Sequence, residues 1–371
     1  MNLSPRTSAR QRLYWASLIE GAVNRRVSWL LRRRGWRPSV LAYTGYGTAG
    51  EVRVLGRVLL APPRTRQRDL QTVRGWRRFL AITAPGVPLT VDVGGHRHRV
   101  VSTRGGYVDV LLPAELAPGW GRVAVSVGGS TPSEVPVFIV GDHPQTGIVS
   151  DIDDTVMITA LPRPLLAFWN TFGRHEAARR PVPGMADLYR SIAAENPDGI
   201  VVYLSTGAWN VAPAIEGFLG RHGFPRGPLL LTDWGPTADA WFRSGKAHKR
   251  TALARLIAEL PQVSWILVGD DGQHDPELYC EAACAAPGQV RAIAVRELTV
   301  AQQLRTHGSA VPPSAKKGQA PVRAPVPEVR GPDGIALVRA LRDRGVLAAA
   351  RLDATVGADD DSSGRASSDV R

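Results

Sequence analysis

Acidic residues cluster at two places in this chain, each directly after a short apolar run. The first cluster is Asp151-Ile152-Asp153-Asp154-Thr155, and the second is Gly269-Asp270-Asp271 with Asp275 shortly after it. Carboxylates crowded at the end of a buried strand repel one another unless a cation neutralises them. Their oxygens suit Mg²⁺, which keeps several waters and bridges carboxylates to a substrate phosphate. The clusters therefore predict a magnesium site, with the second supplying metal ligands or partners for a lysine.

The first cluster also supplies reactive groups for phosphoryl transfer. Asp151 is placed to attack phosphorus and form an aspartyl-phosphate. Asp153, two residues on, can protonate the leaving oxygen and later activate water. The alternative is a solvated acidic turn that caps a helix.

Two further motifs complete a candidate phosphate site. Ser205-Thr206-Gly207 offers a hydroxyl and backbone amides that can hold phosphate oxygens, and Thr155 is another candidate for substrate binding. Lys249, at the start of a predicted helix, can offset the charge of the aspartates and of the transferring phosphoryl group. Lys246 competes for that role, and His248 is a possible accessory. Each motif alone also suits an ordinary turn or surface, but the ordered set predicts phosphoryl transfer.

Five compact apolar runs place these motifs in a fold. The runs cover residues 147–150, 200–204, 229–231, 265–268 and 290–295, and helical stretches such as 212–220 and 249–259 separate most of them. Continuous apolar strands between helices indicate a parallel sheet with helices on both faces. Reactive groups gather at the carboxyl ends of the strands in such a sheet, and the motifs fall there.

Residues 40–140 show short alternating runs broken by Gly and Pro. Val52-Arg53-Val54 and Val123-Ala124-Val125-Ser126-Val127 have the period of two expected of half-buried strands. About seven such segments in this stretch predict a small β-sandwich. His96 and His98 share one face of a predicted hairpin, but with no third ligand nearby we expect a solvated hairpin and no metal site.

The two ends of the chain differ from both regions. Residues 8–36 form a predicted basic amphipathic helix, since apolar residues recur at four-residue steps from Trp15 to Val27. This helix suits an anionic membrane surface, or its apolar face packs on the body of the protein. The chain after residue 305 is rich in Pro, Gly, Ala and Ser and is predicted to be largely disordered, with one short helix across 335–352.

Four regions follow from these patterns: an N-terminal helix (1–39), a β-sandwich (40–145), an α/β catalytic domain (146–305) and a disordered tail (306–371). Net charge is +13, carried mostly by Arg, which reflects either a GC-rich genome or a surface that attracts phosphates. No stretch reaches the roughly 20 apolar residues of a membrane span, and the start does not resemble a secretory signal. The two cysteines, Cys280 and Cys284, are expected to be small core residues in a reducing cytoplasm.

The motifs and their neighbours resemble a known family. The segments that carry the resemblance are Ser150–Thr155, Pro183–Met185, Tyr203–Ser205, Asp233–Gly235, His248-Lys249, Gly269-Asp270 and Asp275–Tyr279. They resemble the haloacid dehalogenase (HAD) superfamily of phosphohydrolases, and more narrowly the phosphatidate phosphatase catalytic domain first known from fungal actin patches. The resemblance covers residues 147–297 and implies an α/β fold, a HAD-like Rossmannoid parallel sheet with helices on both faces, here preceded by the β-sandwich.

The resemblance also implies roles for individual residues. Asp151 would be the nucleophile and Asp153 the general acid/base, with Ser205 contacting phosphate and Lys249 as the catalytic lysine.

Metal ligands follow from the same resemblance. Mg²⁺ would be held by the Asp151 carboxylate, the Asp153 carbonyl and Asp270, with Asp275 completing an acidic pair. Two departures affect the site: Thr206-Gly207-Ala208-Trp209 replaces an Asn-Ser-Pro-Trp-like run, and Asp271 stands where a small serine is expected. The second departure leaves open whether Asp271 or Asp275 completes the metal site.

The sequence thus predicts a magnesium-dependent phosphatase with an aspartyl-phosphate intermediate, acting on phosphatidate or a related lipid phosphate. The alternatives are a phosphatase for a soluble phosphomonoester (a nucleotide, sugar phosphate or nucleic-acid end) and a membrane-surface scaffold with a vestigial site. The aromatic and basic segment 161–181 is either a lid over the site or core and solvated surface. We expect a cytoplasmic protein with peripheral contact at the inner face of the membrane through residues 8–36, and no specific nucleic-acid partner.

Overall fold

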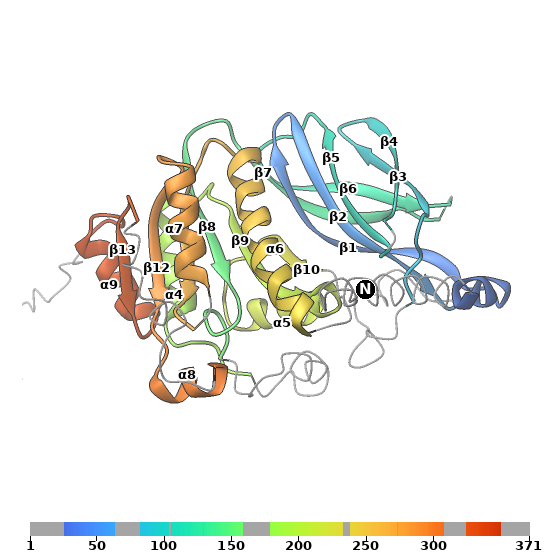
Figure 1. Ribbon diagram of the computed structural model, residues 1–371. Coiled ribbons are helices and arrows are strands. Elements are labelled where there is room, and N and C mark those ends of the chain that lie inside the picture. Colours follow the sequence, from blue (N-terminus) through green and yellow to red (C-terminus); the bar gives the residue numbers. More distant parts are fainter. Residues whose placement is uncertain are drawn as a thin grey trace, which may run out of the picture.

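The fold is that of a computed structural model, which describes residues 26–63, 82–103, 105–128, 130–158, 179–232, 238–272, 274–307 and 324–349. Two sheets follow one another along the chain, one of seven strands and one of six (Figure 1). The candidate site belongs to the second sheet, and the first sheet packs beside it.

The seven-stranded sheet has the order β4-β3-β6-β7-β1-β2-β5. Its strands are β1 (Arg37–Thr48), β2 (Glu51–Ala61), β3 (Pro88–Val93), β4 (His96–Val101), β5 (Tyr107–Pro113), β6 (Gly119–Val127) and β7 (Ser133–Val140). Neighbouring strands are antiparallel except β1 and β7, which are parallel. Because β4 and β5, the two ends of the sheet, contact each other, the sheet curls into a nearly closed barrel (Figure 1).

The predicted β-sandwich is therefore wrong. The alternating segments are strands whose valines do build a core, and Val52, Val91 and Val137 are fully buried. A sandwich needs two sheets packed face to face, whereas here one curled sheet encloses the core by itself. Alternation marks one buried face for each strand in either architecture, so the pattern could not separate the two. β3 and β4 form the predicted hairpin, on which His96 is exposed.

All neighbouring strands of the six-stranded sheet are parallel, in the order β10-β9-β8-β11-β12-β13. The strands are β8 (Gln145–Asp151), β9 (Val201–Ala208), β10 (Leu229–Thr232), β11 (Val263–Asp270), β12 (Val290–Arg296) and β13 (Glu328–Gly331). The five apolar runs read from the sequence are the first five of these strands. They form the centre of the core, where the four residues 265–268 of β11 are fully buried.

Helices cover both faces of this parallel sheet. The helices of this part of the chain are α4 (Met185–Glu195), α5 (Ala212–Arg221), α6 (Ala238–Glu259), α7 (Asp275–Ala285), α8 (Val300–His307) and α9 (Gly334–Asp343), with a short 3₁₀ helix, η3 (Trp209–Val211). α8 lies beyond the ends of the strands (Figure 1). From β8 through α4 to β9 and through α5 to β10, the chain moves toward the β10 edge of the sheet. From β10 through α6 to β11 and through α7 to β12, it moves in the opposite direction. Because both kinds of crossover are right-handed, α4 and α5 lie on one face of the sheet and α6 and α7 on the other. Figure 1 shows α6 and α7 on the near face, with α6 beside the barrel.

The prediction of a largely disordered tail after residue 305 is wrong for residues 324–349. β13 pairs with the edge strand β12, and α9 packs against α4. The Asp333 side chain caps α9 by accepting a hydrogen bond from the Ala336 N–H (2.9 Å). α9 covers only residues 335–343 of the helix predicted across 335–352. Leu337 and Leu341 are fully buried, so this segment is an amphipathic helix in spite of a composition typical of disorder.

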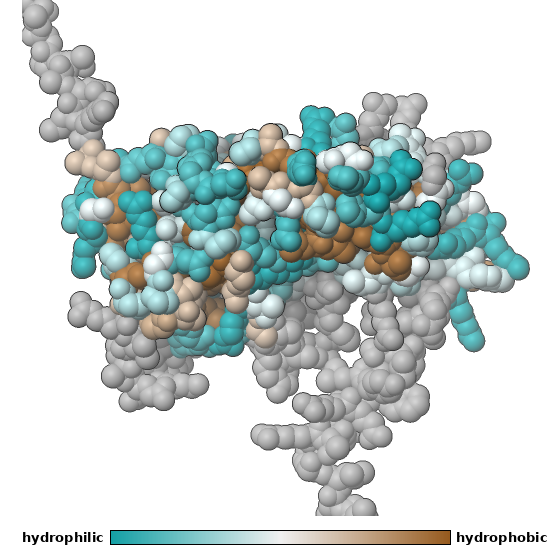
Figure 2. Space-filling view, turned by 90° about the horizontal axis from the view of Figure 1, so that it is seen from above, coloured by the Kyte–Doolittle hydropathy of each residue, from teal (hydrophilic) through white to brown (hydrophobic). Residues whose placement is uncertain are grey.

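The described part of the N-terminal region is a helix over residues 26–33; residues 8–25 of the predicted helix lie outside the described residues. Leu31 packs against the barrel core, whereas Trp29 and Leu30 are about half exposed. No helix among the described residues is long and apolar enough to cross a membrane. The face shown in Figure 2 is mostly hydrophilic with separate hydrophobic patches. Cys280 is buried as predicted, but Cys284 is exposed.

Candidate active site

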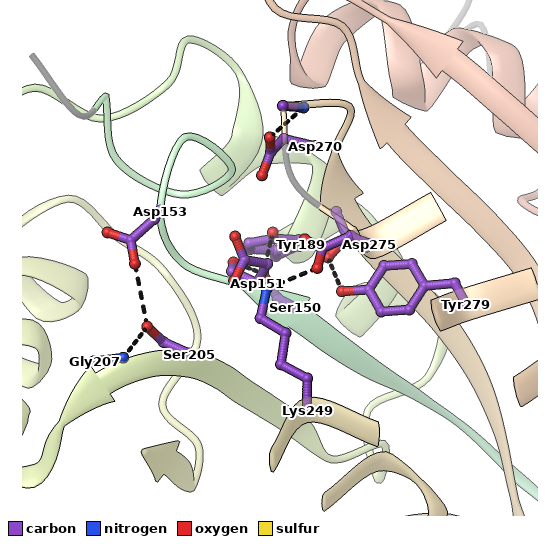
Figure 3. Close-up of polar contacts among 12 residues, drawn as sticks. Ser150, Asp151, Asp153, Tyr189, Ser205, Gly207, Lys249, Asp270, Asp275 and Tyr279 are labelled. Carbon is purple, nitrogen blue, oxygen red and sulfur yellow. Dashed lines mark hydrogen bonds and ion pairs between the residues drawn. The ribbon is translucent and has the colours of Figure 1, made fainter. Parts of the chain in front are cut away.

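Three buried carboxylates meet at the carboxyl edge of the parallel sheet. Asp151 is the last residue of β8 and Asp270 the last of β11, and these strands are neighbours with Val268 opposite Ser150. Asp275 begins α7, which starts just beyond β11. One side-chain oxygen from each of these aspartates lies within 4.8 Å of the others, and all three residues are buried (Figure 3). We call Asp151, Asp270 and Asp275 the acidic group.

A glycine lets α7 approach this edge closely enough to bring in Asp275. A Cβ on Gly269 would lie 2.8 Å from Asp275 Cβ and 2.8 Å from the Tyr279 ring. The Tyr279 hydroxyl donates to the Val268 carbonyl (3.0 Å) and so ties α7 to β11. The third member of the acidic group therefore depends on the missing side chain at residue 269.

Lys249 reaches the acidic group from α6. Its Nζ donates to Asp151 Oδ1 (2.6 Å) and to Asp275 Oδ1 (2.7 Å), and all three side chains are at most 5% exposed. Breaking one partner out of such a buried set leaves an uncompensated charge, which is strongly destabilising. Lys249 therefore fixes the orientation of Asp151. Lys246, the competing candidate, pairs instead with Glu277 (2.9 Å).

The electrostatics of the acidic group show an excess of negative charge. Burial raises the pKa of Asp151 well above its usual range, and Lys249 opposes this rise. Burial, with Asp275 next, also raises the pKa of Asp270. Burial acts to lower the pKa of Lys249, but Asp151 and Asp275 outweigh it and the pKa is raised. Lys249 pairs with Asp151 (2.6 Å) and Asp275 (2.7 Å), whereas Asp270 Oδ1 accepts a hydrogen bond from the Gly272 N–H (2.7 Å).

The residues present fit a metal cation. Four buried carboxylate oxygens have no hydrogen-bond partner among the described residues: Oδ2 of Asp151, Asp270 and Asp275, and Oδ1 of Asp153. One lysine cannot balance these carboxylates, and buried charged groups are ordinarily paired or bound to metal. An all-oxygen donor set suits a hard divalent cation. The acidic group can therefore hold a metal ion.

Asp153 lies on the loop after β8, next to the acidic group and facing β9. Its Oδ2 accepts a hydrogen bond from Ser205 Oγ (3.2 Å). The loop turns at Asp154, which has a φ of 57°, and the Asp154 carbonyl accepts from the buried Arg296 guanidinium (2.5 Å). Burial raises the pKa of Asp153, while Lys249 and Arg179 work to lower it.

Sequence reasoning missed two residues that fix this loop. Arg296, the last residue of β12, donates a hydrogen bond to the Asp154 carbonyl. Tyr189 of α4 places its hydroxyl 2.6 Å from Ser150 Oγ, which in turn donates to the Asp151 carbonyl (2.6 Å). The position of Arg296 at a strand end, like those of the acids, was the one available signal in the sequence.

The Ser205–Gly207 motif forms the end of β9. The Gly207 N–H donates to Ser205 Oγ (3.0 Å), so this amide is already engaged. The carbonyl of Thr206 accepts from Thr232 of β10 (2.8 Å), which ties the two strand ends together. Thr155 is fully buried, and no described residue partners its hydroxyl. The structure therefore brings Ser205 to Asp153 and leaves Thr155 with an unused polar group.

The remaining residues predicted for the site lie outside the acidic group. Asp271, which the sequence could not distinguish from Asp275, accepts from the Leu298 N–H (2.9 Å) and is not a member of the group. His248 faces the barrel side of α6, and burial lowers its pKa. Residues 161–178 of the proposed lid and Asp233–Gly235 lie outside the described residues.

Comparisons with known proteins point to one family. Residues 146–297 match the model of the family described as phosphatidate phosphatase APP1, catalytic domain. Phosphatidate phosphatase APP1 of Saccharomyces cerevisiae is 24% identical over 234 residues, which cover 59% of this chain and 39% of that protein. An uncharacterized protein of Schizosaccharomyces pombe is 29% identical over 175 residues, 45% of this chain and 27% of that one. The chain thus spans less than half the length of the curated relatives it matches.

Two solved structures show a weaker similarity to this chain. A carbohydrate acetylesterase from Xanthomonas citri covers 82% of this chain, and 74% of that chain is covered, at 13% identity and a TM-score of 0.29. A glycosyl hydrolase family 2 member from Bacteroides cellulosilyticus reaches a TM-score of 0.22 at 11% identity, covering 72% of this chain and 37% of that one. The HAD-like fold class predicted from the sequence is corrected by the strand arrangement: the structure has the parallel sheet described above beside a barrel-like mixed sheet. What the sequence comparisons do establish is that residues 146–297 of this chain match the family of the phosphatidate phosphatase APP1 catalytic domain.

Proposed function

We propose that this protein is a magnesium-dependent phosphoric monoester hydrolase whose nucleophile is Asp151. The observation that carries the proposal is the buried contact of Lys249 with both Asp151 and Asp275, beside Asp153 and Ser205. A fixed cation between two carboxylates at a strand edge orients a nucleophile and offsets the charge of a phosphoryl group. The family of the catalytic domain supports the same reaction class.

The reaction divides into two steps. In the first, an Asp151 carboxylate oxygen attacks phosphorus, the bond from phosphorus to the leaving oxygen breaks, and protonated Asp153 gives its proton to that oxygen. In the second, Asp153 takes a proton from water as the water oxygen attacks the aspartyl-phosphate. The bond from phosphorus to Asp151 then breaks, which releases inorganic phosphate and restores the carboxylate.

Each nearby side chain has a role in these steps. Burial raises the pKa of Asp153, which favours the protonated form that the first step needs. The Ser205 hydroxyl positions the Asp153 carboxyl and lies within reach of a phosphoryl oxygen. Thr155 and Thr206 are proposed substrate contacts, with Gly207 supporting Ser205. Mg²⁺ held by Asp151, Asp270, Asp275 and the Asp153 carbonyl would supply positive charge to the transferring phosphoryl group.

Phosphatidate is the first candidate substrate, since the yeast relative is a phosphatidate phosphatase. A lipid substrate requires contact with a membrane surface. Trp29 and Leu30 support such contact because they are about half exposed and stand among Arg26 and the run 32–34. We accordingly propose a cytoplasmic protein that binds the inner face of the membrane through this helix.

The catalytic proposal is tested by phosphate release from phosphatidate vesicles and from a soluble aryl phosphate. We expect activity that needs Mg²⁺ and is lost in Asp151→Asn. The matched control is Asp187→Asn, an exposed aspartate of α4. Activity that survives both EDTA and Asp151→Asn would refute the mechanism. Activity on the soluble ester alone would favour the soluble-phosphomonoester alternative.

The membrane proposal is tested by co-sedimentation with anionic vesicles. We expect Trp29→Ser with Leu30→Ser to weaken binding, because each removes exposed apolar surface from the basic helix. Val101→Ser is the control, since Val101 is a 63% exposed apolar residue on β4. Equal binding by all variants would contradict the membrane role of this helix, and binding without phosphate release would favour a scaffold with a vestigial site.

A further inference from the structure

The helix that carries Lys249 is held between two partners. On one side of α6, Leu253 and Leu256 join the core of the parallel sheet, and Lys249 reaches the acidic group. On another side, Arg255 and Glu259 lie four residues apart, so they share one face of the helix. That second face meets the barrel.

Charged groups join this face to the barrel in a continuous chain. Glu259 accepts from Arg53 Nε (2.9 Å) and Nη2 and from the Tyr46 hydroxyl (2.9 Å). Arg53 also donates to Asp109 Oδ1 (2.5 Å), and Asp109 Oδ2 accepts from Arg255 (2.8 Å). Four charges of alternating sign thus connect β2, β5 and α6. We call these four residues the interface network.

The interface network differs from a surface ion pair. The side chains of Arg53 and Glu259 are 11% and 16% exposed, whereas those of the barrel pair Arg97–Asp92 are 73% and 37% exposed. The fork of Arg53 binds both carboxylates at fixed angles, which a single point charge could not do. Exposed ion pairs contribute little to stability, but a part-buried network with a bidentate arginine holds its members in one relative position.

A second set of contacts holds the end of β9 from the same barrel. The Tyr43 ring stacks on Trp209 of η3, with centroids 4.3 Å apart and planes at 26°. Arg57 donates to Asn210 Oδ1 (2.8 Å). η3 follows β9 directly, so these contacts hold the end of the strand that carries Ser205 against the barrel.

The barrel and the parallel sheet share one core at this boundary. Tyr43, Tyr46 and Leu55 belong to the same buried cluster as Trp209 and the strands of the parallel sheet. Interiors of this kind are closely packed and transmit displacement instead of absorbing it. The family match covers residues 146–297 and does not include the barrel.

We propose that the barrel is a positioning element of the phosphatase site, in which Arg53 sets the place of Lys249 through Glu259 and α6. Arg53 touches no reacting group, so it is a positioning residue and acts only through the helix. The proposal rests on the proposed function, since it assigns a role in that reaction.

The test compares Arg53→Met and Arg53→Lys with the control Arg97→Met in the full chain. Phosphate release from a soluble aryl phosphate gives kcat and KM, and hydrogen–deuterium exchange reports on amides 245–256 of α6. We expect Arg53→Met to lower kcat by about ten- to a hundredfold with KM little changed, since small misplacement of a catalytic group has effects of this size. Exchange in α6 should rise, Arg53→Lys should be intermediate, and Arg97→Met should match the wild type.

Each other outcome has one meaning. Wild-type kcat and exchange in Arg53→Met would overturn the proposal while leaving the phosphatase function standing. Equal losses in Arg53→Met and Arg97→Met would overturn it too, because the effect would then be general destabilisation. If Arg53→Met unfolds, Glu259→Gln replaces it, because glutamine keeps an acceptor for Tyr46 without the charge. If the wild type hydrolyses no phosphomonoester, the proposed function fails, and unchanged exchange in α6 would then overturn the positioning role separately.

Discussion

Replacing Asp270 with asparagine changes one charge in the acidic group and little else. Asp270 Oδ1 accepts a hydrogen bond from the Gly272 N–H (2.7 Å), and an asparagine oxygen can accept the same bond. The side chains have nearly the same volume, so packing is preserved. Asp270→Asn therefore isolates the electrostatic cost of this carboxylate in the metal-free protein and its contribution to metal binding.

The geometry sets the size of the effect. The carboxylate oxygens of the acidic group lie within 4.8 Å of one another, and at that limit two unit charges repel by about 3.5 kcal/mol at an effective dielectric constant of about 20. Lys249 offsets part of this repulsion, because it contacts the other two members of the acidic group. We expect the metal-free variant to be more stable than the wild type by about 1–3 kcal/mol. For a domain of this size that corresponds to a rise of about 2–10 °C in Tm.

Thermal unfolding followed by circular dichroism, in EDTA and in excess MgCl₂, measures both effects. The wild type should gain stability from the metal, since a ligand that binds only the folded state stabilises it. Asp270→Asn should have the higher Tm in EDTA and gain little from MgCl₂. Asp271→Asn is the matched control, because Asp271 lies in the same loop but accepts from the Leu298 N–H outside the acidic group.

Two results would refute this reasoning. If Asp270→Asn is less stable in EDTA and keeps the full stabilisation by MgCl₂, the acidic group is not a metal site and its charges do not repel as the geometry requires. If Asp271→Asn loses the stabilisation instead, the wrong carboxylate has been assigned to the metal.

Three further substitutions test the supports of the site. Gly269→Ala should lower the free energy of unfolding measured in urea by about 1–3 kcal/mol and weaken stabilisation by metal, because the new Cβ would lie 2.8 Å from Asp275. The control Gly220→Ala in α5 should change neither quantity, because nothing lies within 4 Å of its Cβ. Arg296→Met should cost about 1–3 kcal/mol, since it leaves the buried Asp154 carbonyl without this donor, and unchanged urea unfolding would contradict it. Ser205→Ala should lower kcat for aryl phosphate by about tenfold or more, and a purely structural Ser205 would leave kcat unchanged at full stability.

Much of the catalytic side of the molecule was readable from the sequence. The apolar runs at 147–150 and 265–268 became adjacent parallel strands, because continuous burial on both faces leaves a local pattern. Asp151 and Asp270 then had to share an edge, since parallel strands end at the same side of a sheet. The candidate residues around them could be named for the same reason.

The β region and the tail were harder to read. Alternation gives one buried face for each strand, so it predicted the strands but not whether they form two sheets or a single curled one. Composition after residue 305 suggested disorder, yet β13 and α9 complete the parallel sheet. Their stability comes from packing on β12 and α4, and such long-range contacts have no signature in composition.

By itself the sequence thus determined which residue types stand at which strand ends, because strand and helix periods are properties of neighbouring residues. Only the tertiary structure decided that Asp275, and not Asp271, faces Asp151, since the direction of each side chain depends on how α7 packs over Gly269. The tertiary structure alone brought Lys249 to two carboxylates and Arg53 to Glu259. Lys249 is 98 residues from Asp151 in the sequence, and Arg53 is 206 residues from Glu259. Charges that far apart in the sequence meet through the packing of distant elements, which a local sequence pattern does not record.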